Sequence, residues 1–105
     1  MKSELFAKII NVVAQVTELE PAQILSKTKT DDLVAARSLF VHQCVKVGIP
    51  SVSIAKYMAR TKTNSVNRYL SSYESYIKTS YYFREMDCRI TSLISPQLSQ
   101  IHAAK

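Results

Sequence analysis

SVSIAKYMARTKTNSVNRYLSSYES, residues 51–75, places two amphipathic segments on either side of a short basic turn. In the first segment, Ile54 and Met58 lie four residues apart and share one face of a helix. After the turn, an apolar stripe with helical spacing begins again at Val66. A short helix, a turn and a longer helix in this order predict a helix-turn-helix over about residues 51–78.

The second of these segments has a polar face that suits DNA. An arginine on such a helix, here Arg68, can bind guanine with two hydrogen bonds, and Asn67 can do the same for adenine. We therefore expect residues 62–72 to enter the major groove of double-stranded DNA. The side chains predicted to contact bases or phosphates there are Lys62, Thr63, Asn64, Ser65, Asn67, Arg68 and Ser71.

The charge of the chain indicates an anionic partner. The chain has 105 residues, a length typical of one domain, and carries a formal net charge of +6. Residues 33–73 contain no acidic side chain, so the positive charge is concentrated around the predicted motif. Arg37 has a second interpretation, a surface salt bridge to Asp31 or Asp32. The candidates for phosphate contacts are Lys27, Lys29, Arg37, Lys56, Arg60 and Lys62.

Upstream of this stretch the sequence predicts three more helices, over about residues 3–17, 21–25 and 31–47. Glu20 followed by Pro21 is typical of a helix start, and Thr30 before two aspartates is another. Gly48, the only glycine in the chain, stands where the third helix should stop, and Ser51 is expected to cap the next one. Residues 26–30, SKTKT, read as a basic loop.

Downstream, apolar residues at helical spacing predict a further helix over about residues 80–94. Whether residues 64–93 form one helix or two stays open, because no glycine or proline separates them at Thr79 or Ser80. The tail after Pro96 is expected to form one weak turn or to fray. Together these patterns predict a single all-α domain, residues 1–105, of five to six helices with a variant helix-turn-helix.

The register of the central stretch differs from a standard helix-turn-helix. If Ala55 takes the position of the small residue, the first apolar residue of the second helix should be residue 65. Residue 65 is Ser65, and the apolar residue is Val66, so the turn is one residue longer than usual.

That longer turn resembles the DNA-binding carboxy-terminal domain of the bacterial replication initiator DnaA, whose pattern runs S-L-P-x-I-G-x-x-F-G-G-R-D-H-T-T-V. Residues 51–54, SVSI, and 58–66, MARTKTNSV, stand at the matching places. Upstream, residues 24–27, ILSK, are similar to that family's L-L-S-K, and Arg37 falls on the arginine of its R-P-R-Q segment. The resemblance covers most of residues 5–77 and implies a Trp-repressor-like helix-turn-helix that binds double-stranded DNA.

The chain also departs from that family's pattern. The two turn glycines of the family are replaced by Ala59 and Arg60, and its Arg-Asp-His triplet by residues 61–63, TKT. Ala35 stands where the family has the first arginine of its basic segment. The resemblance therefore implies DNA binding without the initiator's own target sequence or its ATPase activity.

A helical protein-interaction module is the alternative function. In it, Tyr76, Tyr81, Tyr82 and Phe83 would bind a protein partner or a second copy of the chain. Tyrosines at three- and four-residue spacing are more typical of a helix core or helix interface than of stacking on single-stranded nucleic acid. This applies to Tyr69, Tyr73, Tyr76, Tyr81 and Tyr82, of which Tyr81 and Tyr82 have the better claim to a partner surface.

The sequence offers little support for catalysis. His42 and His102 have no Cys, Asp or Glu at metal-ligand or triad spacing, and no glycine-rich phosphate loop is present. Cys44 and Cys88 are expected to be buried, reduced thiols. We therefore expect a cytoplasmic, non-enzymatic protein without a cofactor, a metal site or a membrane span.

Overall fold

The computed structural model is an all-α fold, as the sequence predicts. It describes the backbone of residues 2–26, 28, 30–58 and 64–103, and the side chains of residues 4–26, 28, 30–58 and 66–94. No strand occurs in these segments, and none of their helices is both long and apolar enough to cross a membrane. The six helices are α1 (Lys2–Thr17), α2 (Pro21–Leu25), α3 (Asp31–Lys46), α4 (Ser51–Tyr57), α5 (Asn64–Thr79) and α6 (Tyr81–Ala103).

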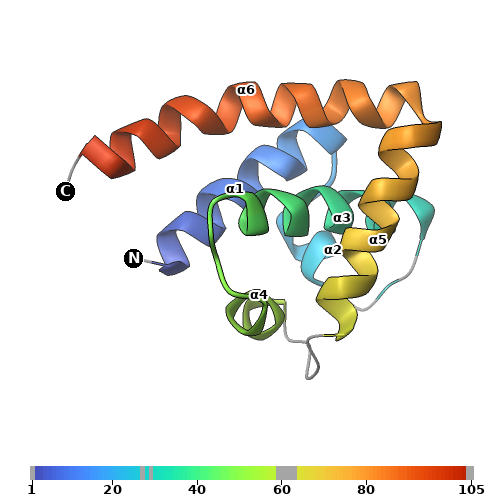
Figure 1. Cartoon of the computed structure of the whole chain (residues 1–105), viewed down its shortest axis with the longest axis horizontal. Coiled ribbons are helices and arrows are strands. Elements are labelled where there is room, and N and C mark those ends of the chain that lie inside the picture. Colours follow the sequence, from blue (N-terminus) through green and yellow to red (C-terminus); the bar gives the residue numbers. More distant parts are fainter. Residues whose placement is uncertain (1, 27, 29, 59–63, 104–105) are drawn as a thin grey trace.

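Helix α3 lies at the centre of the fold, and the other helices surround it (Figure 1). Leu39, Phe40 and Val41 are three consecutive residues without exposed surface, which requires neighbours on several sides of the helix. α5 forms the most extensive packing with α3, α1 covers another side, and α6 lies across α1. Because α3 is held from several sides, it fixes the position of α5.

Most helix ends follow the local signals in the sequence. Pro21 begins α2, and the side chain of Gln23 accepts a hydrogen bond from the backbone N–H of Glu20 at 2.9 Å. The Thr30 hydroxyl accepts from the N–H of Leu33 at 3.3 Å and caps α3. Gly48 follows the end of α3 with a φ of +90°, a conformation that a side chain disfavours. These predicted starts and stops are confirmed.

Two boundaries differ from the prediction, and one open question is answered. α4 begins at Ser51, and its N-cap is Pro50. α6 continues past Pro96 to Ala103, although a proline inside a helix removes one backbone hydrogen bond and crowds the carbonyl group four residues earlier. α5 and α6 are separate helices, since the Ser80 hydroxyl accepts from the N–H of Phe83 at 3.2 Å and starts α6.

Candidate nucleic-acid interface

Helix α5 has one packed side and one exposed side. Val66 is completely buried, and Tyr69, Leu70 and Tyr73 are half-buried against the core. The exposed positions of α5 recur every three or four residues on the opposite side of the helix. Asn67, Arg68 and Ser71, three of the predicted DNA contacts, are all exposed there. The structure therefore brings them together on a single face of one helix.

Helix α4 is held by apolar side chains and presents one lysine. Ile54, Ala55 and Met58 are buried, as the spacing predicts, while Lys56 is exposed. At the end of α4, the ring of Tyr57 stacks on that of Phe6 with centroids 4.4 Å apart. Helix α4, which carries Lys56, packs against α3 and α5 and lies at the lower end of the molecule in Figure 1.

For several predicted contacts, the structure does not describe the side chain. Asn64 and Ser65 begin α5, and only their backbone is described. The predicted turn between α4 and α5, residues 59–63, and two residues of the basic loop fall outside the described residues. The predicted contacts concerned are Lys27, Lys29, Arg60, Lys62 and Thr63.

Arg37 is buried, which corrects its predicted role as a phosphate contact. Its side chain has no exposed surface, so it cannot reach DNA. Nε donates to the carbonyl oxygen of Ile24 at 2.7 Å, and Nη2 donates to that of Ser26 at 2.6 Å. A weaker bond from Nη2 to the carbonyl oxygen of Gln23 measures 3.3 Å. Arg37 therefore binds the last carbonyl groups of α2 and fixes the residue that precedes Lys27 in the chain.

A polar network between α3, α5 and α6 has no counterpart in the sequence analysis. The Tyr73 hydroxyl donates to Oδ2 of Asp87 at 2.9 Å, and Nε2 of the buried Gln43 donates to the Thr91 hydroxyl at 3.2 Å. The imidazole of His42 stacks on the Tyr73 ring with centroids 3.7 Å apart. Because these partners are 14 to 48 residues apart in the chain, local patterns could not reveal them. The network joins the middle of α5 to α3 and α6.

Protonation of His42 should weaken this region. Burial lowers the pKa of His42 from 6.5, Lys46 lowers it further, and Asp87 opposes both. A histidine with a lowered pKa stabilises the fold when neutral, so stability is present above pH 6.5 and is lost as pH falls through the folded-state pKa. We expect urea unfolding midpoints to fall more between pH 7.5 and 5 in the native chain than in His42→Phe, which retains the ring. Equal pH dependence in the two proteins would contradict this assignment.

The partner surface that the sequence predicts loses one of its members in the structure. Phe83 is 2% exposed and packs against the rings of Tyr73 and Tyr76, so it is a core residue. Tyr81 and Tyr82 are each 70% exposed and remain available to a partner.

The two cysteines lie in different environments. Cys44 is buried as predicted, and burial raises the pKa of its thiol. Cys88 is exposed, which corrects the prediction that both are buried, because its position on α6 faces away from the core. Among the described residues, no three His, Cys, Asp or Glu side chains are grouped so that they could hold a metal ion.

Comparison with known proteins adds no family to these observations. No protein-family model matches the chain, and no curated protein gives a significant match.

Proposed function

We propose that this chain is a non-catalytic protein that binds double-stranded DNA, with α4 and α5 as a variant helix-turn-helix and α5 in the major groove. The observation that carries the proposal is the exposed group of Asn67, Arg68 and Ser71 on the outer face of α5. Amide and guanidinium groups can each form two hydrogen bonds with a base edge, and hydroxyl groups bind either bases or phosphates. The resemblance to the initiator's DNA-binding domain agrees with this use of the helix.

The distribution of charge supports the same surface. The sequence from residue 33 to 73 has no acidic side chain, and the first acid on α5, the exposed Glu74, comes about 1.7 turns after Arg68. Lys56, exposed on α4, would contact a phosphate beside the groove. An α-helix fits the major groove of B-DNA, and a neighbouring lysine on the phosphate backbone would fix its register. Lys27 and Lys29 would hold the flanking backbone, from a loop whose first residue is bonded by Arg37.

Fluorescence anisotropy with a labelled random duplex across a salt series tests this function. We expect a dissociation constant of about 1–100 µM near physiological salt and tighter binding at lower salt. Lys56→Ala should weaken all duplexes alike and reduce the log–log salt slope by about one. Arg84→Ala removes the same charge from an exposed position on α6 and serves as the control. No measurable binding at low salt would refute the proposal.

Sequence preference depends on a different residue. Selection of bound duplexes from a random pool should give a preferred site, and Arg68→Ala should relax the preference at one base pair, at a cost of about 1–3 kcal/mol for that site. The effect of Arg68→Ala on the affinity for random duplexes should be small by comparison. If Arg68→Ala weakened every duplex equally, Arg68 would be a phosphate contact and not a base contact.

Binding of a protein partner is the second candidate function, and the exposure of Tyr81 and Tyr82 favours it. Exposed neighbouring aromatic rings are typical of interface residues. The two tyrosines start α6, at the opposite end of α5 from Asn67 and Arg68 (Figure 1). A partner bound there would leave the proposed DNA surface free.

A further inference from the structure

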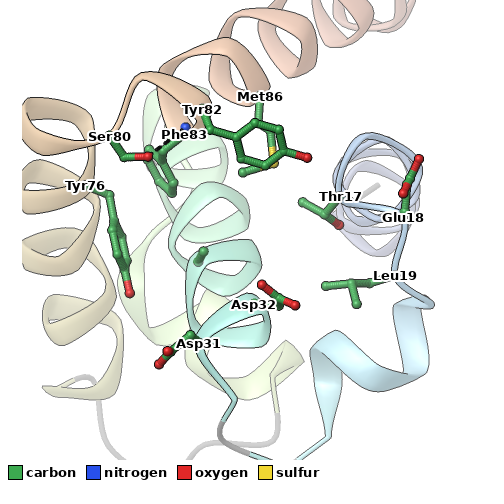
Figure 2. A pocket seen from close by; sticks show the side chains of 11 residues that line it. Thr17, Glu18, Leu19, Asp31, Asp32, Tyr76, Ser80, Tyr82, Phe83 and Met86 are labelled. Carbon is green, nitrogen blue, oxygen red and sulfur yellow. Dashed lines mark hydrogen bonds between the residues drawn. The ribbon is translucent and has the colours of Figure 1, made fainter.

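A cavity of about 540 Å³ lies where the ends of α1, α3, α5 and α6 meet (Figure 2). Pockets of about 300–1,000 Å³ are the usual size for holding a small ligand. Three carboxylates line it, those of Glu18, Asp31 and Asp32, and none of the lining residues is basic. In a chain with a net charge of +6, this cavity is a local region of opposite sign.

The helix dipole explains part of this arrangement but not all of it. Asp31 and Asp32 occupy the first turn of α3, where acidic side chains are favoured in any protein. That effect does not account for the apolar wall that faces them across the cavity. Tyr76, Tyr82 and Met86 supply that wall from α5 and α6. Acids and aromatic rings are thus combined in one hollow.

This combination fits the guanidinium group of arginine better than the ammonium group of lysine. Arginine stacks its planar group on an aromatic face and forms two parallel hydrogen bonds with a carboxylate. Figure 2 shows the Tyr82 side chain extended from α6 toward the end of α1, with Asp32 below it on α3. Tyr82 is 70% exposed, so its ring is accessible to a stacking partner. Lysine, a point charge on a flexible stem, would use these groups less completely.

Further hollows follow the cavity along α6, which favours a peptide over a free amino acid as the ligand. Two further hollows of about 500 Å³ and 250 Å³ lie between α1 and α6 and share lining residues with the first. Glu18 belongs to the first two, and Tyr82 to the first and third. The three together are lined by four carboxylates and one guanidinium, that of Arg89. The exposed apolar Leu93 lies at the far part of this groove.

We propose that the groove from Asp31 to Leu93 binds an arginine-bearing segment of a partner protein, with the arginine in the cavity and apolar neighbours along α6. The excess of carboxylates repels nucleic acid, so the groove and the proposed DNA surface have different ligands. The proposal rests on the second candidate function, a protein partner, and does not depend on DNA binding.

NMR titration of the ¹⁵N-labelled chain with the tripeptide acetyl-Leu-Arg-Leu-amide tests the proposal. We expect saturable shifts of the backbone amides around Glu18, Asp32 and Tyr82, with the amides of Asn67 and Arg68 unchanged. The same peptide with citrulline, which keeps the shape but lacks the charge, should bind about ten-fold more weakly, because it loses the charge-assisted bonds. The affinity of the same peptide with lysine should lie between those of the arginine and citrulline peptides.

Two variants locate the binding. Asp31→Asn with Asp32→Asn should weaken the arginine peptide about ten-fold, whereas Glu74→Gln, an exposed acid of α5 outside the groove, should not. Tyr82→Ala at an exposed position leaves the core intact and should weaken binding several-fold, with recovery in Tyr82→Phe.

Three results would overturn the proposal. Equal binding of the citrulline peptide would leave an apolar groove without arginine recognition. Shifts outside the groove would place the site elsewhere. Association of the chain with itself through Asp31 and Asp32, without any peptide binding, would identify a second copy as the occupant. The anisotropy measurement with duplex DNA is independent of all three results.

Discussion

Replacing Arg37 with alanine should lower the free energy of unfolding by about 3–5 kcal/mol. Three backbone carbonyl groups near the end of α2 accept hydrogen bonds from this side chain, and the closest two distances are 2.6 and 2.7 Å. Each bond to a charged donor contributes about 1.5–3 kcal/mol when the acceptor cannot reach water instead. Truncation also leaves a cavity in place of one of the largest fully buried side chains.

One terminal nitrogen limits this stabilisation. Nη1 of Arg37 is buried and meets no acceptor among the described residues. An unsatisfied donor costs about 1–3 kcal/mol, which is less than the contribution of the bonds made by Nε and Nη2. The bonds made by Nε and Nη2 therefore outweigh this one unsatisfied donor.

Urea unfolding followed by circular dichroism measures the Arg37 effect. Arg37→Lys should lower the free energy of unfolding by roughly half as much as Arg37→Ala. Lysine keeps the charge and part of the volume of arginine but not its planar group of donors. Arg68→Ala removes the same charge from an exposed site on α5 and should change stability by less than about 0.5 kcal/mol. A loss below 1 kcal/mol for Arg37→Ala would show that the carbonyl groups find other donors.

DNA binding by Arg37→Ala checks that this arginine is structural and is not a phosphate contact. At a temperature where Arg37→Ala is still folded, a purely structural arginine predicts an unchanged salt slope for duplex binding. A phosphate contact would instead reduce the slope by about one in an alanine variant and leave it unchanged in a lysine variant. The buried position of Arg37 leads us to expect no change in either variant while it is folded.

Arg37 also shows where the sequence is informative and where it is not. Helix periods and caps depend on residues within four positions of each other, so Thr30, Pro21 and Gly48 could be interpreted from their neighbours alone. The partners of Arg37 lie 11 to 14 residues away on another helix. A basic residue in an acid-free stretch looks like a surface charge until that helix is placed beside it.

Phe83 and Cys88 illustrate the same limit on α6. Both occur in a segment with helical spacing, and the period alone does not say which face of the helix meets the core. The position of α6 across α1, and the polar network around Asp87, decide that Phe83 is buried and Cys88 is exposed. The groove along α6 likewise depends on four helix ends that are distant in sequence. The exposed face of α5 was predictable, because one helix contains all of it.

Replacing Phe40 with alanine should cost about 3–5 kcal/mol of unfolding free energy, the second large effect that we expect. The ring has no exposed surface, and its centroid lies 6.3 Å from that of Phe6 and 6.0 Å from that of Tyr57. These three rings come from α3, α1 and α4, so the cluster joins three helices. Val45→Ala truncates an apolar side chain of α3 that is 39% exposed, and should change stability by less than about 0.5 kcal/mol.

The loss of stability in Phe40→Ala should loosen α4 before the other helices. A helix of seven residues is too short to be stable alone, since isolated helices below about 12–15 residues are marginal in water. α4 therefore depends on the aromatic cluster and on the buried Ile54. Hydrogen exchange of the Met58 amide, which donates to the carbonyl oxygen of Ile54 at 3.0 Å, should accelerate more in Phe40→Ala than exchange in the middle of α3.

Uniform acceleration of exchange across α3 and α4 would show that the two helices unfold as one unit and would contradict a local role for the cluster. If α4 does loosen first, Lys56 loses its fixed position while Arg68 on α5 keeps its own. Phe40→Ala should then weaken duplex binding in the manner of Lys56→Ala, equally for all sequences, and leave the base preference of Arg68 intact. The two helices of the proposed DNA surface would thus be separable, one contributing affinity through the backbone and the other contributing selectivity.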